Sequence, residues 1–191
     1  MAIKKYTADA DNTIVNTYKS DLQTRATGSN AGYADVMEVY SIYGREHSGS
    51  QELSRILVKF PITDIITDRA SGDIPASGSI SFYMRLFNAQ HSKTVPEDFK
   101  LTTSSSDYLY EQAFESGLED LEIDITPMVE SWIAGTISNY GVLVKLSSSY
   151  EASASAAATT ADSSVITNTD GATTSYYTKR FFARGSEYFF K

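Results

Sequence analysis

The chain has 191 residues, of which 41% are hydrophobic, 12% are aromatic and none is cysteine, and its formal net charge is −8. The lack of cysteine excludes a disulfide framework and a cysteine-based zinc site. The acidic balance argues against nucleic acid as a direct partner, because phosphate recognition needs a basic face. The hydrophobic content excludes a chain that is disordered throughout.

The N-terminal sequence gives no sign of export. Polar residues follow Met1 to Lys5 at once, whereas a secretory signal needs an apolar run of about 7–15 residues. No segment approaches the roughly 18 apolar residues of a membrane span. We therefore expect synthesis in a host cytoplasm, no signal peptide and no contact with a membrane. The last five residues resemble a strand that stops early at Lys191, so we expect them to pair with a partner or to belong to a longer chain.

Alternation of apolar and polar residues predicts a series of half-buried strands. In the third of them, Ile56, Val58 and Phe60 are expected to face inward, and Pro61 ends the strand because it cannot donate to a ladder. The predicted strands are residues 13–18, 36–43, 55–60, 80–87, 121–125, 142–146 and 176–182.

One short helix is predicted to begin at Pro127 and to end at Ala134. Thr126 is a suitable N-cap, and proline at the first helical position loses no hydrogen bond. Gly135 can end the helix in a left-handed conformation. Trp132 is expected to close one end of the core rather than to stack on a ligand, because its neighbours are apolar. The residues that share its helix face are Met128, Val129 and Ile133.

Two long polar segments separate the predicted strands. Residues 104–120 are polar, aromatic and acidic, and they are predicted to form a loop. Residues 147–175 are rich in Ser, Thr and Ala without apolar periodicity, which is typical of a low-complexity insertion. The pattern as a whole predicts an all-β protein, a jelly-roll β-sandwich with one short helix and long polar loops. We expect a single domain over residues 1–191, with its core at about residues 9–184.

A resemblance to a known family accompanies this pattern. Residues 124–135 are DITPMVESWIAG, residues 139–145 are NYGVLVK, and residues 54–60 are SRILVKF. These segments resemble, in the same order, the core motifs of the DNRLRE domains. The resemblance implies a β-sandwich of the jelly-roll type, and some members of that family are carbohydrate-binding modules that recognise alginate-like polymers.

The lack of a leader, together with this resemblance, favours a bacteriophage virion protein. The segment from Tyr176 to Arg184 is similar to segments of phage structural proteins that carry a DNRLRE-like core. We expect a non-enzymatic component of the capsid, neck, tail or fibre that binds copies of itself and other virion proteins. The alternative is a carbohydrate-binding module for a cell-surface or extracellular polysaccharide.

Few residues suggest metal or catalytic chemistry. Asp9, Asp11 and Asn12 bring together three oxygen-bearing side chains, which calcium favours, but their spacing lacks the glycine and terminal glutamate of a calcium loop. A solvated turn is therefore the first interpretation and a structural calcium ion the second. His47 and His91 have polar neighbours and are expected on the surface. No other cofactor is expected.

An enzyme is not expected. The sequence contains no glycine-rich phosphate loop, nucleophile elbow or metalloprotease motif. Glu122 and Asp124 share one face of a predicted strand, where a solvated acidic surface is the simpler interpretation than a glycosidase pair.

Aromatic and arginine residues indicate two candidate binding surfaces. Tyr40 and Tyr43 could stack on a sugar, with Arg45 close by to donate hydrogen bonds to it. The alternative is that the two rings pack at the edge of the core, with their hydroxyls in water. The C-terminal strand is rich in the residue types that are enriched at protein interfaces, although it could be an ordinary core strand. The interface candidates are Tyr176, Tyr177, Arg180, Phe182, Arg184 and Tyr188.

Overall fold

The protein consists mainly of antiparallel strands with two short helices, so the all-β expectation is confirmed. The computed structural model describes residues 3–19, 24–26, 28, 31–44, 50–89, 99–105, 108–147, 151 and 174–186. The strands are β1 (Ala10–Val15), β2 (Val36–Gly44), β3 (Ser50–Lys59), β4 (Tyr83–Leu86), β5 (Phe99–Ser105), β6 (Tyr108–Phe114), β7 (Leu121–Asp124), β8 (Val142–Leu146) and β9 (Thr174–Phe182). The helices are α1 (Ile62–Ser71) and α2 (Thr126–Ile133).

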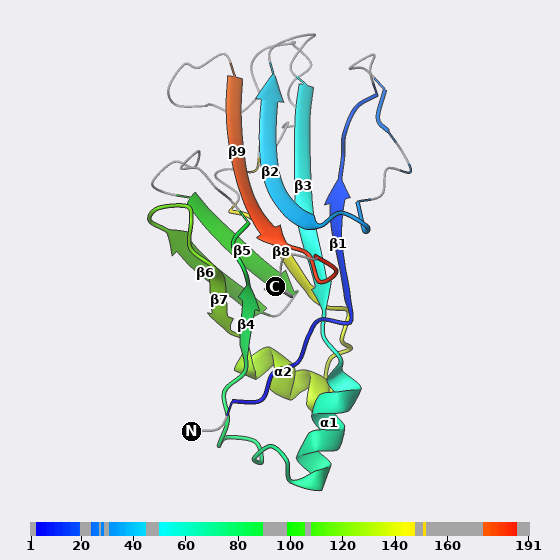
Figure 1. The fold of residues 1–191 in the computed structure, drawn as a ribbon, viewed down its shortest axis with the longest axis vertical. Helices are drawn as coiled ribbons and strands as arrows, with labels where there is room; N and C mark the ends of the chain where they lie inside the picture. The colour runs from blue at the N-terminus through cyan, green and yellow to red at the C-terminus, as the bar shows by residue number, and fades with distance from the viewer. Residues whose placement is uncertain are drawn as a thin grey trace.

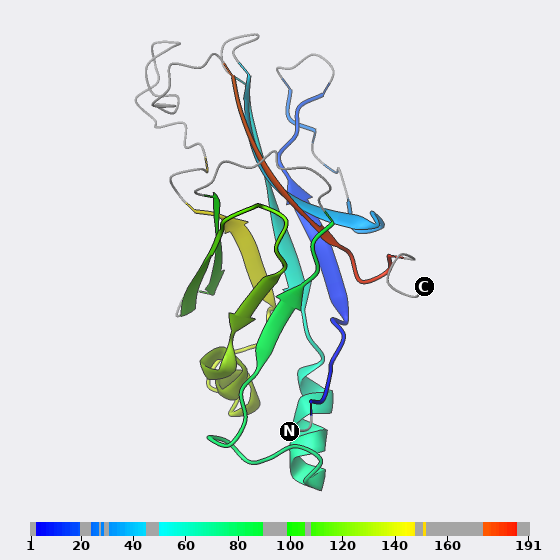
Figure 2. The ribbon, with the colours of Figure 1, turned by 60° about the vertical axis from the view of Figure 1, so that its left-hand side comes forward.

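Strand β3 is the centre of the larger sheet. The hydrogen-bonded order is β6-β5-β8-β3-β2-β9, with β1 also paired to β3, and β4 pairs with β7 separately. The first half of β3 pairs with β2, and its second half pairs with β1 and β8. Strands β9, β2, β3 and β1 run side by side (Figure 1), and both helices lie at one end of the molecule in both views (Figures 1 and 2).

Main-chain contacts between β9 and the residues just after β4 connect the two sheets. Asn88, just after β4, forms a bridge with Phe181 of β9. The backbone N–H of Ala89 donates to the carbonyl oxygen of Arg180 at 3.0 Å, and the N–H of Phe182 donates to Phe87 at 3.0 Å. Segments that lie more than ninety residues apart along the chain are thereby joined by main-chain hydrogen bonds.

Alternating apolar side chains from both sheets form the core. Leu121 and Ile123 of β7 are buried while the acidic residues between and after them are exposed. Ile56 and Val58 are buried and Phe60 is partly buried, as the alternation predicts. Inward apolar positions are favourable at about 25 cal/mol per Å² of apolar surface that is removed from water.

Helix α2 is the predicted helix, displaced by one residue. Trp132 is only 6% exposed and packs in the core, and Gly135 has φ 70°, so both of these expectations are confirmed. The expected role of Thr126 is wrong, because the N-cap is Ile125 and no side chain caps the helix. The hydroxyl of Thr126 instead accepts a hydrogen bond from the N–H of Phe82 at 2.7 Å, which ties the helix to the segment before β4.

The expectation of a single helix is wrong, because residues 62–71 form α1. Isoleucine and threonine are weak helix formers, and no side chain caps the start of α1 after Pro61. The helix ends at Gly72, which has φ 84° and donates its N–H to the carbonyl oxygen of Arg69. Apolar spacing at Ile62, Ile65 and Ile66, together with Gly72, was the available signal. Because local propensity is weak here, contacts with α2 are needed to hold the helix.

The expectation of a loop at residues 104–120 is also wrong for much of that segment. Strand β5 pairs with β6 along its whole length: Phe99 lies opposite Phe114 at one end, and Ser105 lies opposite Tyr108 at the other. In β6 the inward positions carry tyrosine and glutamine before Phe114, which is buried. Because these inward residues are polar, the sequence of β6 lacks the alternation of apolar and polar residues by which a strand is recognised.

Parts of the chain named above lie outside the described residues. Of the predicted insertion at residues 147–175, the structure describes Ser147, Glu151 and the beginning of β9. Residues 187–191 are likewise outside the described part. Neither described helix is long and apolar enough to cross a membrane.

Candidate functional site

The side chain of Lys179 on β9 is fully buried. Its Nζ donates hydrogen bonds to Oδ1 of Asn88 at 2.5 Å and to the carbonyl oxygen of Gly117 at 2.8 Å. The ring centroids of Phe114 and Phe181 lie 5.0 and 5.2 Å from the same nitrogen. The amine is therefore enclosed by aromatic rings and two neutral acceptors.

Burial changes the acidity of this amine. Removal from water lowers the pKa of Lys179 to about 8, against the raising influence of the nearby carboxylates of Glu119 and Asp120. A larger fraction of this lysine is uncharged near neutral pH than of an exposed lysine, whose pKa is about 10.4.

Glu119 lies two residues after Gly117, the second acceptor of the lysine amine. Its Oε1 accepts hydrogen bonds from the backbone N–H and the hydroxyl of Ser116, both at 2.7 Å. Its Oε2 is buried and accepts no hydrogen bond from the described residues. Burial alone would raise the pKa of Glu119, but the hydrogen bonds from Ser116 and the charge of Lys179 outweigh it and hold this pKa at about 2.

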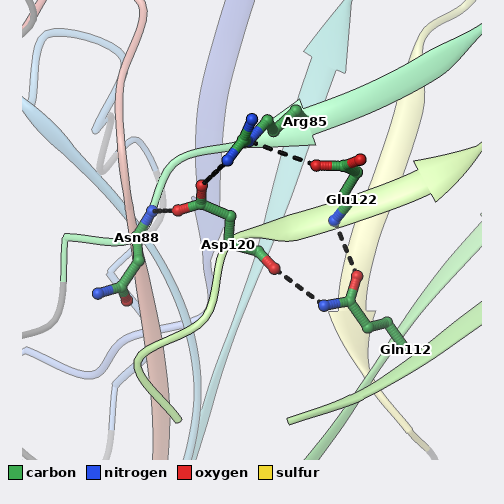
Figure 3. A network of polar contacts seen from close by, with 5 residues as sticks. All are labelled: Arg85, Asn88, Gln112, Asp120 and Glu122. Carbon is green, nitrogen blue, oxygen red and sulfur yellow. Dashed lines mark hydrogen bonds and ion pairs between the residues drawn. The ribbon is translucent and has the colours of Figure 1, made fainter.

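Asn88, which accepts the hydrogen bond from this lysine, is held by a polar network of its own (Figure 3). Oδ1 of Asp120 accepts the backbone N–H of Asn88 at 2.8 Å, and its Oδ2 accepts Nε and Nη2 of Arg85 at 3.0 and 2.8 Å. Gln112 donates to the backbone oxygen of Asp120 at 2.9 Å and accepts the N–H of Glu122 at 2.8 Å. The backbone at Asn88 is thus fixed by β4, β6 and β7 together.

The site therefore joins three parts of the chain: β9, the residues after β4 and the connection between β6 and β7. Sequence reasoning missed it, because the C-terminal strand was singled out for its aromatic and arginine residues and not for Lys179. The available signal was alternation, which places Lys179 on the same strand face as Phe181. Chemically, the site holds a desolvated amine against a primary amide, with a carboxylate close by.

The structure does not bring the weak calcium candidates together, and Asp11 lies in β1 against Arg184 rather than in a solvated turn. Oδ2 of Asp11 accepts the backbone N–H of Arg184 at 2.6 Å, and its Oδ1 lies 3.6 Å from the arginine Nε. Asp9 contributes its backbone oxygen to the same guanidinium at 2.6 Å. Asn12 follows Asp11 in β1 and so projects from the opposite face of the strand. In the described part of the chain, no group of three acidic, histidine or cysteine residues is placed to hold a metal ion.

The interface candidates on β9 make contacts within the chain. Nε of Arg180 lies 3.0 Å from Oε1 of Glu38 on β2, and Arg184 binds Asp11 as described above. Tyr177 packs against the core and Phe182 is half-buried. Tyr188 and the side chain of Tyr176 lie outside the described residues. No outward aromatic cluster is assembled from the described members of this set.

Of the glycan candidates, the structure describes the side chain of Tyr40. Tyr40 is half-buried, and its backbone N–H donates to the hydroxyl of Ser54 at 2.8 Å. The side chain of Tyr43 and all of Arg45 lie outside the described residues.

A different pair of rings is exposed on β4 and just after it. Tyr83 is 61% exposed and Phe87 is 41% exposed. Arg85 lies between them in sequence, with its guanidinium carbon 5.1 Å from the centroid of Phe87. Tyr83 and Arg85 alternate with the buried Met84 and Leu86, so alternation was the signal for this surface.

A shallow hollow between the helices is the other candidate. Arg69 of α1 and Glu130 of α2 line it, together with Ser131 and Ile133. The two charged groups bind each other at 2.7 and 2.8 Å through both oxygens and both terminal nitrogens. This charge pairing makes the hollow a weaker candidate than the Lys179 site.

Comparisons with protein-family models, with curated proteins and with solved structures found no match for this chain.

Proposed function

We propose that this chain is a non-enzymatic structural module of a bacteriophage virion, which works through contacts with copies of itself and with other virion proteins. The observation that carries the proposal is the enclosed Lys179, whose amine connects β9 to Asn88 and Gly117. A buried charge-bearing group that binds distant segments stiffens a fold without offering an open site. Rigid β-sandwiches of this kind suit a protein whose task is to hold its shape in an assembly.

The finer fold belongs to the same proposal. The bridge between Asn88 and Phe181 extends the β2–β9 pair by β4 and β7. A second sheet in the order β7-β4-β9-β2 would then face a first sheet in the order β1-β3-β8-β5-β6. Two packed antiparallel sheets of this kind are the architecture of a jelly roll. The resemblance to the DNRLRE domains favours the same architecture.

Strand β6 is a suitable element for assembly. It ends the described strand order, so one of its edges has no neighbour among the described strands. Its outward residue Leu109 is 65% exposed. Unpaired strand edges and exposed leucines favour association with another chain.

The test is the state of the full chain in solution and in particles. We expect an oligomer by light scattering, with an interface above about 1,000 Å² per complex, and co-purification with the particles encoded by the same genome. Leu109→Glu should weaken the association, whereas Leu118→Glu, a change at another exposed leucine outside the strand, should not. A monomer that is absent from purified particles would overturn the proposal.

The second candidate function is carbohydrate binding, and the exposed Tyr83 and Phe87 favour it. Sugar C–H faces stack on exposed rings, and Arg85 between them can donate to hydroxyl or carboxylate oxygens. Tyr83→Ala and Phe87→Ala should each abolish binding on a polysaccharide array. Tyr140→Ala, which removes an 87% exposed ring elsewhere, should leave it unchanged. A blank array across neutral and anionic polymers would remove this candidate.

A further inference from the structure

We propose that Lys179 and Asn88 are the reacting pair of an intramolecular isopeptide bond, in which Nζ of the lysine becomes bonded to Cγ of the asparagine and ammonia leaves. The structure holds the two side chains as the hydrogen-bonded pair that precedes the reaction, with Nζ 2.5 Å from Oδ1. The amide carbon is one C=O bond, about 1.23 Å, from that oxygen. Nζ therefore lies no more than about 3.7 Å from Cγ, close to the roughly 3–3.5 Å of a near-attack geometry.

The fold holds both residues of the pair, Lys179 and Asn88, in place. Lys179 is anchored by β9, and its second hydrogen bond to Gly117 limits rotation of the amine. Asn88 is anchored by its bridge to Phe181 and by the hydrogen bond from its backbone N–H to Asp120. Because the two groups are fixed by the fold, their reaction is intramolecular and needs no further ordering of the chain.

The surroundings favour an amine that can attack. A nucleophilic lysine must be uncharged, and burial among apolar groups is one way to obtain this state. Lys179 is fully buried between the rings of Phe114 and Phe181. The pKa of its amine is lowered, which also favours the uncharged form.

We assign the proton transfer to Glu119 acting through one water molecule, because no ion pair within 4.0 Å joins it to Lys179 among the described residues. Its Oε2 is buried without a hydrogen-bond partner among the described residues, and its negative charge interacts with the charge of Lys179. Its other oxygen is held by Ser116, so the carboxylate is oriented. A buried carboxylate with one uncommitted oxygen can accept a proton and return it.

The reaction is balanced without any added reagent. The Nζ lone pair of neutral Lys179 attacks Cγ of Asn88, and the C=O electron pair moves onto Oδ1. Through one water molecule, Nζ gives a proton to Glu119, which passes it to the departing amide nitrogen. The carbonyl re-forms as the Cγ–Nδ2 bond breaks, and ammonia leaves. Nothing is oxidised or reduced, Glu119 is regenerated, and the chain becomes lighter by one ammonia molecule.

The product would be a covalent link between residues that are 91 positions apart. It would join the end of β4 to β9, the same place at which the two sheets share main-chain hydrogen bonds. Cross-links that close long loops stabilise a fold mainly by restricting its unfolded state. This bond does not depend on the proposed virion function.

The intact mass of the purified full chain tests the proposal. We expect the mass to be lower than the sequence mass by one ammonia, after allowing for removal of Met1. Trypsin should then release a branched peptide that joins residues 86–93 to residues 146–180, and tandem mass spectrometry should place the link at Asn88 and Lys179. The branched peptide separates this bond from a cyclised asparagine, which loses the same mass. A wild-type chain of full mass that yields two separate peptides would overturn the proposal.

Three variants assign the roles. Asn88→Ala should have its full calculated mass and give no branched peptide. Glu119→Gln keeps the size of the side chain and an oxygen for Ser116, and it should likewise remain unlinked while folded by circular dichroism. Glu111→Gln, a matched change at an exposed acid on β6, should still form the link. A folded Glu119→Gln chain that forms the link as fast as the wild type would overturn the role of Glu119.

Discussion

Gly141 lies directly against the backbone of Val58. A Cβ atom added at Gly141 would be 2.5 Å from the carbonyl oxygen of Val58 and 3.2 Å from its carbonyl carbon. Asn139 supports this approach: its Oδ1 accepts the N–H of Gly141 at 3.0 Å, and its Nδ2 donates to the carbonyl oxygen of Phe60 at 3.0 Å. The close contact sets the position at which β8 begins to pair with β3.

Gly141→Ala should destabilise the protein by about 2–6 kcal/mol. Gly141 has φ +90°, which costs an alanine about 1–3 kcal/mol, and the clash with Val58 adds a further cost of about 1–3 kcal/mol. Gly72→Ala is the matched control, because its φ is +84° but nothing lies within 4 Å of the added Cβ. Urea unfolding should show a clearly smaller loss for the control, and equal losses would contradict the role of the contact.

The ion pair between Arg69 and Glu130 should hold α1 to α2. Its side chains are 16% and 22% exposed and meet through two hydrogen bonds. Arg69→Met should lower the free energy of unfolding by about 1–3 kcal/mol, because a partly buried carboxylate loses its partner. The more exposed pair of Arg180 and Glu38 should show a coupling energy below about 1 kcal/mol. Double-mutant cycles on both pairs measure this, and equal coupling would argue against a special role for the helix pair.

Glu119 should make part of the stability depend on acidic pH. Its folded pKa of about 2 lies below the unfolded value of about 4.3. This contribution is therefore complete above about pH 4.3, and it is lost as the pH falls toward 2. Ser116→Ala removes one hydrogen bond to the carboxylate and raises its folded pKa, so the acid-unfolding midpoint should move to higher pH. Circular dichroism between pH 2 and 6 measures the midpoint, and the exposed change Ser138→Ala should leave it in place.

Trp132 should report on the core. It is the one tryptophan of the sequence and is 6% exposed. Its fluorescence should be blue-shifted in the folded chain and shift to the red in a single transition on unfolding. Trp132→Ala should cost about 3–5 kcal/mol, and Trp132→Phe should cost much less because the smaller ring leaves less empty volume. A solvent-exposed emission maximum in the folded chain would contradict this placement.

The sequence by itself determined the elements whose pattern is local. Alternation in residues 121–125 and 142–146 predicted β7 and β8, and the apolar spacing around Trp132 predicted α2. Period two and period 3.6 are properties of a few neighbouring residues, so they can be recognised before any tertiary contact is known.

The tertiary structure alone decided the rest. Helix α1 has weak helical propensity and is held by Arg69 against Glu130, and β6 carries polar residues where alternation needs apolar ones. The juxtaposition of Lys179, Asn88 and Glu119 follows from the main-chain hydrogen bonds between β9 and the residues just after β4, which bring together segments far apart along the chain. Burial, and with it the shifted acidity of the lysine, arises only when those segments pack. No local pattern carries that information, because the low dielectric and the neighbouring charges are supplied by other parts of the fold.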